Sequence, residues 1–234
     1  MRRLFFKLVA RNITLSLLFI ISLSHAHAAV SDASRIYRET PTLAGFDVCF
    51  GGGCAEIEHV SITAEEWRNV IAVFNVVDDL QTSNNSQNNS QTSAEQERKN
   101  IAQAIGLLEN IVGLKIGTSQ DLAGTFNNSD HPSQLDCNDE AINTTSYMRL
   151  ILASNLIKLH AIEDMRTRNF FFTGWPHTTA VIHEKLTGQR FAVDSWFYDN
   201  GMPATIVPFD VWKSGYVPAD SPLSHSQNAH QTSE

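Results

Sequence analysis

A β-hairpin is the feature of this 234-residue chain that most restricts its fold. Two runs rich in strand-forming residues, 177–184 and 189–196, are separated by the turn sequence KLTG. The residues before the hairpin, from about 137 to 160, carry apolar side chains at helical spacing. The chain is therefore expected to combine helices with antiparallel strands.

The hairpin also separates the two histidines of its first strand. With the turn centred near residues 186 and 187, His183 faces the start of the second strand, close to Arg190. His177 falls opposite Asp194 to within about two residues of register, which is within reach of an imidazole–carboxylate hydrogen bond. His177 is therefore the candidate catalytic histidine, and His183 is expected to take no part.

Two of the three cysteines are expected to form a disulfide. Cys49 and Cys54 enclose the sequence FGGG, which allows the tight turn that a short disulfide loop needs. A metal site at this place would require two further ligands, and only His59 lies close by in the sequence. Pairing these two cysteines leaves Cys137 without a partner.

Cys137 lies at the expected start of a helix, with Asp136 as the N-cap. The exposed N–H groups of a helix N-terminus stabilise a thiolate. The charges of Asp136, Asp139 and Glu140 oppose this effect. Helix position alone is therefore insufficient to activate the thiol, and a neighbouring imidazolium would be needed.

Cys137, His177 and Asp194 together have the composition of a cysteine-type acyl-transfer site. Each residue also has an ordinary structural explanation, and a lone cysteine near a helix start is more often a small buried hydrophobic residue. The combination of an unpaired thiol, a helix N-terminus, and a histidine and an aspartate on adjacent strands favours the catalytic interpretation.

The first 28 residues have the pattern of a secretory signal peptide. Four basic residues precede the apolar run 13–23, and Ala26 and Ala28 supply the small residues of a cleavage site after Ala28. The apolar run is too short for a stable membrane anchor, so the protein is expected to be exported, either periplasmic or secreted. The arginine pair also resembles a twin-arginine export motif, but an ordinary basic n-region accounts for it.

Charge excludes two classes of partner. Removal of residues 1–28 takes away four of the 17 basic residues and none of the 25 acidic ones, which leaves a formal charge of −12 with neutral histidines. An acidic protein without a basic run is a poor ligand for nucleic acid or for anionic lipid.

The remaining segments are predicted as a scaffold around the candidate site. Apolar periodicity predicts helices from about 63 to 77 and from 94 to 112, with Gly113 ending the second. The Asn/Ser/Gln-rich stretch 81–93 is expected to be a flexible insertion between them. A single domain over 29–218 would follow the signal peptide, and residues 219–234 are expected to form a disordered tail.

The sequences DCND and PHTTAVIHEKLTGQRFAVDSW, within residues 134–196, resemble the bacterial transglutaminase-like cysteine proteins, which are relatives of the papain-like superfamily. The resemblance implies an α+β fold with a helix packed on an antiparallel sheet. It also implies that Cys137 is the nucleophile, His177 the base and acid, and Asp194 the group that orients the imidazole. The 81–93 insertion has no counterpart in the family pattern.

This scheme predicts thioester chemistry without a cofactor or a metal ion. The Cys137 thiolate attacks an amide or ester carbonyl of a peptide or protein substrate, and water or a second amine resolves the thioester. The backbone N–H of Cys137 and the side chain of Gln134 are candidate oxyanion donors. Two alternatives remain open: a non-catalytic binding or maturation factor with the same fold, and a Cys/His/Asp metal site.

Overall fold

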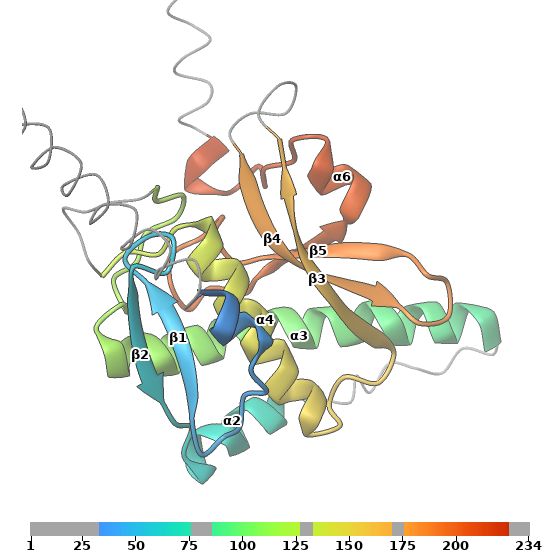
Figure 1. Cartoon of the computed structure of the whole chain (residues 1–234). Helices are drawn as coiled ribbons and strands as arrows, with labels where there is room; N and C mark the ends of the chain where they lie inside the picture. Colours follow the sequence, from blue (N-terminus) through green and yellow to red (C-terminus); the bar gives the residue numbers. More distant parts are fainter. Residues whose placement is uncertain (1–32, 76–85, 127–132, 170–175, 225–234) are drawn as a thin grey trace, which may run out of the picture.

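The computed structural model describes residues 33–75, 86–126, 133–169 and 176–224 (Figure 1). The expected signal peptide lies outside these ranges. Within them, helices and antiparallel strands are combined, which confirms the α+β class. None of the described helices has the length and apolarity needed to cross a membrane.

The elements form a helical layer and two antiparallel sheets. In chain order they are β1 (Phe46–Phe50), β2 (Glu56–Val60), α2 (Ala64–Asn75), α3 (Ser86–Ile116), α4 (Cys137–Ala153), β3 (His160–Arg168), β4 (His177–Glu184), β5 (Arg190–Asp194), β6 (Thr205–Pro208) and α6 (Phe209–Lys213). Figure 1 shows α4 between the β1–β2 ribbon and the larger sheet, with α3 crossing behind it. The helix that carries Cys137 is thus central to the molecule.

The larger sheet has four antiparallel strands in the order β3-β4-β5-β6. Its β4–β5 hairpin confirms the prediction, although β5 ends at Asp194, two residues earlier than expected. His183 pairs with Arg190, as the turn position predicted. Ala180 pairs with Val193, and continuing this register by one residue places Thr179 opposite Asp194.

Helix α4 begins at Cys137 because Asp136 forms a capping box with Asp139. The Asp136 side chain accepts hydrogen bonds from the N–H groups of Asn138 and Asp139. The predicted extension of this helix to about residue 160 is wrong. Asn155 adopts a left-handed conformation with φ of 58°, just after the C-cap, and the chain then enters β3.

Helix α3 is longer at both ends than predicted. Its backbone is helical from Ser86, so the expected flexible stretch 81–93 is helical over the part that the structure describes. Gly113 lies inside the helix, where a Cβ would come 3.0 Å from Asn200 Oδ1. Gly117, with φ of 84°, follows the last helical turn instead. Close packing therefore explains the glycine at position 113, and helix termination explains the glycine at position 117.

The hydrophobic core lies between α3, α4 and the four-stranded sheet. Its fully buried side chains include Leu108 of α3, Met148 of α4 and Ile182 of β4. The first residues of the expected disordered tail 219–234 pack on the domain, because Ser221 is buried and its hydroxyl donates to the carbonyl of Phe197 at 2.7 Å. Residues 225–234 lie outside the described ranges.

Candidate active site

The structure brings His177 and Asp194 together as the hairpin register predicted. His177 is the first residue of β4 and Asp194 is the last of β5, and Nε2 lies 2.6 Å from Oδ2. Both residues are 2% exposed. The imidazole also packs beside Trp196, with ring centroids 4.5 Å apart. The pair is therefore a buried, directly bonded histidine–carboxylate unit.

A tryptophan that sequence analysis did not select completes this pair. The indole N–H of Trp212, on α6, donates to the same Asp194 oxygen at 2.6 Å. An indole N–H can only donate, so Asp194 Oδ2 is an acceptor in this bond. The same oxygen accepts from the Nε2–H of His177. The other ring nitrogen, Nδ1, is buried and has no hydrogen-bond partner among the described residues. Its lone pair is thus available to take up a proton.

The sulfur of Cys137 lies beside the strand residue that follows this histidine. The thiol is unpaired and 8% exposed, and the backbone N–H groups of Thr178 and of Cys137 itself lie within hydrogen-bonding reach of the sulfur. Burial raises the pKa of the thiol to about 11, with the charges of Asp136 and Asp194 acting in the same direction and the two N–H groups opposing them. Thr178 directly follows His177, so the sulfur faces the start of β4.

Gln134, the other candidate oxyanion donor, has both ends of its amide in hydrogen bonds with residues of a nearby loop. Its amide Nε2 donates to the carbonyl of Gln120 at 3.0 Å, and its Oε1 accepts from the N–H of Leu122 at 3.0 Å. The side chain therefore anchors a neighbouring loop. The Asp136 cap leaves the N–H of Cys137 free of its side chain, because its hydrogen bonds go to Asn138 and Asp139.

The predicted disulfide between Cys49 and Cys54 is present, and its loop docks on the first turn of α4. The N–H groups of Gly52 and Cys54 donate to Asp139 at 2.7 and 2.5 Å. The side chain of Asn143 bonds both to the N–H and to the carbonyl of Cys49. The loop thus fixes the end of the helix that presents Cys137.

Two buried acidic side chains, Glu140 of α4 and Glu109 of α3, lie near Ser195. Ser195, which follows Asp194, donates its hydroxyl to Glu140 Oε2 at 2.5 Å. Burial raises the pKa of Glu140 well above its usual value, and the charge of Glu109 on α3 adds to the effect. The carboxyl of Glu140 thus links the first turn of α4 to the residue that follows β5.

Two other histidine–carboxylate pairs have structural roles. His183 Nδ1 lies 3.0 Å from Glu163, which also binds Arg190, so the expectation that His183 takes no part agrees with its contacts. His160 lies with Nδ1 2.8 Å from Glu97 and Nε2 3.1 Å from the guanidinium of Arg98. His160 thus joins two residues of α3 to the start of β3.

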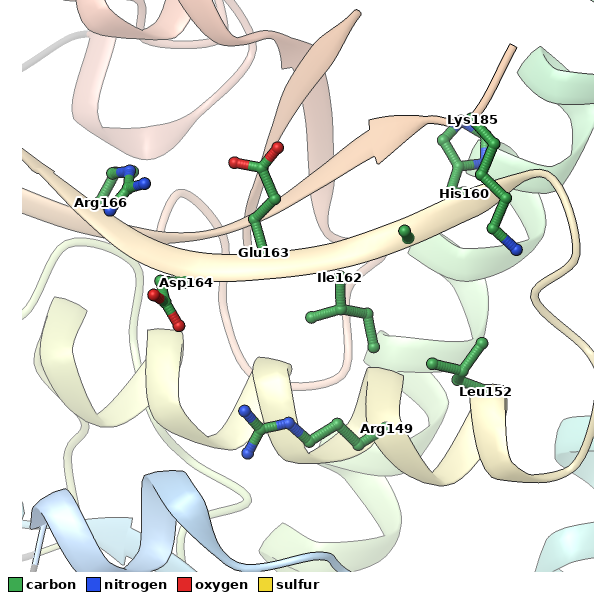
Figure 2. A pocket seen from close by; sticks show the side chains of 9 residues that line it. Arg149, Leu152, His160, Ile162, Glu163, Asp164, Arg166 and Lys185 are labelled. Atoms are coloured by element: carbon green, nitrogen blue, oxygen red, sulfur yellow. The ribbon is translucent and has the colours of Figure 1, made fainter. Parts of the chain in front are cut away.

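An open groove lies away from the candidate catalytic residues, along β3. Figure 2 shows it along β3, with Ile162 and Asp164 pointing towards Arg149 on α4 and Glu163 pointing the other way. It measures about 700 Å³, and none of the three candidate catalytic residues lines it. Among the residues placed by the structure, no three His, Cys, Asp or Glu side chains are grouped so as to hold a metal ion.

Comparison of the chain with protein-family models, with curated proteins and with solved structures gave no significant match.

Proposed function

We propose that this chain is a cysteine-dependent acyl-transfer enzyme of the transglutaminase-like type. Cys137 is the nucleophile, His177 the base and acid, and Asp194 the residue that orients the imidazole. The observation that carries the proposal is the 2.6 Å bond from His177 Nε2 to Asp194, which leaves Nδ1 without a partner beside the strand segment that contacts the thiol.

The arrangement of elements supports the same assignment. A helix with the cysteine in its first turn contacts an antiparallel sheet, and two neighbouring strands of that sheet carry the histidine and the aspartate. The disulfide supports export, because such bonds persist in oxidising compartments. An exported chain would begin at Ala29, which N-terminal sequencing of the mature protein would test.

The reaction begins with proton transfer from Cys137 Sγ to His177 Nδ1. The thiolate attacks the carbonyl carbon of an amide or ester, and the oxyanion of the tetrahedral intermediate accepts a hydrogen bond from the N–H of Cys137. The carbon–nitrogen or carbon–oxygen bond then breaks, and the leaving group takes the proton from Nδ1. Water or an amine then attacks the thioester and passes a proton to His177. The carbon–sulfur bond breaks, which releases the acid or the new amide, and the Cys137 sulfur recovers the proton from His177.

The buried environment makes His177 essential to this scheme. A thiol whose pKa burial raises to about 11 is almost fully protonated at neutral pH. A stable thiolate at pH 7 therefore needs the positive charge of a protonated His177 next to it. Dependence of the thiolate on His177 therefore distinguishes a catalytic Cys137 from a buried cysteine without a catalytic role.

The rate of iodoacetamide alkylation of Cys137 against pH tests the proposal. We expect half-maximal alkylation of the wild-type protein below pH 8, and loss of this fast reaction in His177→Ala. His183→Ala is the matched control, since His183 lies on the same strand but bonds to Glu163, and it should behave as wild type. Equal rates in the wild type and His177→Ala, rising only at or above the ordinary thiol pKa of about 8.5, would refute the proposal.

Burial of the site favours one alternative, a non-catalytic binding or maturation factor. Only 8% of Cys137 and 2% of His177 are exposed. Such a factor would show slow alkylation, and it would not hydrolyse an activated ester such as p-nitrophenyl acetate. The enzyme should release nitrophenol in a burst equal to the protein concentration, and Cys137→Ser should abolish the burst.

A further inference from the structure

Arg168 is a buried cation directly beside the candidate site. It is the last residue of β3, it pairs in register with His177 of β4, and it is 6% exposed. Arginines are rarely buried to this extent unless an acidic group accompanies them. No salt bridge joins Arg168 to a carboxylate within the described ranges. Its position therefore requires another explanation.

The hydrogen bonds of Arg168 fix the segment that carries Trp212. One guanidinium nitrogen donates to the carbonyls of Trp212 and Tyr216, at 2.7 and 3.1 Å. The guanidinium carbon lies over the Trp212 ring, 5.0 Å from its centroid. Since the indole N–H of Trp212 donates to Asp194, the arginine is connected to the histidine–carboxylate pair through one side chain.

Two negatively charged groups of the proposed reaction, Asp194 and the Cys137 thiolate, act on Arg168. Burial lowers the pKa of Arg168, and the negative charges of Asp194 and of a Cys137 thiolate raise it. Asp194 and Asp136 both disfavour the thiolate. A guanidinium inside the protein acts across a low dielectric and therefore interacts more strongly with these groups than a surface charge would. Its Nε is also without a hydrogen-bond partner among the described residues.

We propose that Arg168 is the positioning residue of this site, a buried cation that holds Trp212 against Asp194 and stabilises the thiolate of Cys137. The proposal rests on the proposed function, because a thiolate matters only if Cys137 is the nucleophile. Arg168 itself touches neither the substrate nor the bond that breaks. It acts through Trp212 and through its charge.

Two substitutions separate the charge from the hydrogen bonds. Arg168→Lys keeps the positive charge and loses the planar fork, whereas Arg168→Gln keeps an N–H donor for the Trp212 carbonyl and loses the charge. Arg166→Gln is the matched control, because Arg166 is exposed on the same strand. The pH midpoint of iodoacetamide alkylation is measured for each full-length protein, with folding checked by circular dichroism.

We expect the midpoint to rise by at least one pH unit in Arg168→Gln and to stay close to wild type in Arg168→Lys and Arg166→Gln. A folded Arg168→Gln protein with the wild-type midpoint would overturn the proposal and make the role of Arg168 purely structural. Should the glutamine variant fail to fold, a folded Arg168→Lys protein whose midpoint rises by a full unit would overturn it equally.

Failure of the proposed function gives a different result. In that case the wild type and His177→Ala alkylate alike, and neither shows an ester burst. Failure of the present proposal alone leaves the difference between the wild type and His177→Ala intact while the substitutions at Arg168 have no effect on the midpoint.

Discussion

The buried carboxyl groups beside α4 predict that the protein loses stability as the pH rises. Burial raises the pKa of Glu109 to about 8 and the pKa of Asp121 to about 8, while carboxyls in an unfolded chain titrate near about 4. The folded protein therefore binds more protons than the unfolded chain between these values. The stability due to these protonated groups is fully present below about pH 4 and is lost as the pH rises through about 8.

The substitution Glu109→Gln isolates one of these groups. Each extra proton held by the folded state changes the free energy of unfolding by about 1.4 kcal/mol per pH unit. Between pH 5.5 and 7.5 the wild type should therefore lose up to about 2.7 kcal/mol more than the variant. At pH 5.5 the two proteins should be similar, because glutamine has the neutral charge and nearly the shape of a protonated glutamate and keeps an acceptor oxygen.

Urea unfolding at three pH values between 5.5 and 7.5 measures this difference. Glu95→Gln is the control: Glu95 is an exposed partner of Lys99 with a lowered pKa, so its removal should leave the pH dependence unchanged in this interval. If Glu109→Gln has the same pH dependence as the wild type, then Glu109 is ionised in the folded protein and the reasoning fails.

Three further substitutions test the packing. Gly106→Ala should lower the thermal midpoint, although alanine ordinarily favours a helix by about 1 kcal/mol, because its Cβ would lie 2.5 Å from the carbonyl oxygen of Met202; a higher midpoint would show that this contact relaxes freely. Leu108→Ala should cost about 2–5 kcal/mol in urea unfolding, since the side chain is fully buried, and a loss below about 1 kcal/mol would place it outside the core. Replacing both Cys49 and Cys54 by alanine should cost about 2 kcal/mol from the entropy of the short loop alone, and an unchanged urea midpoint would contradict that estimate.

Local signals account for what the sequence predicted correctly. The hairpin follows from alternating strand residues around a turn, and its register placed His177 near Asp194. The start of α4 follows from the cap at Asp136, a contact within three residues. Gly113 was misinterpreted as a helix end because its role depends on Asn200, far away in the chain.

Long-range contacts account for what the sequence missed. The bond from Trp212 to Asp194 and the position of Arg168 follow from how α6 and β3 pack, and no spacing rule indicates them. Asp139 accepts hydrogen bonds from a loop more than eighty residues earlier. The His177–Asp194 pair was thus predictable, while the residues that support it were not.

The disulfide loop makes the presentation of Cys137 dependent on the redox state of the chain's surroundings. While Cys49 and Cys54 are thiols, the N–H groups of Gly52 and Cys54 are less firmly held against Asp139. Asp139 then loses two of the hydrogen bonds that lower its pKa, and the first turn of α4 is held less firmly. We therefore expect a newly made chain in a reducing compartment to position Cys137 less firmly, and to reach its final geometry when Cys49 and Cys54 are oxidised.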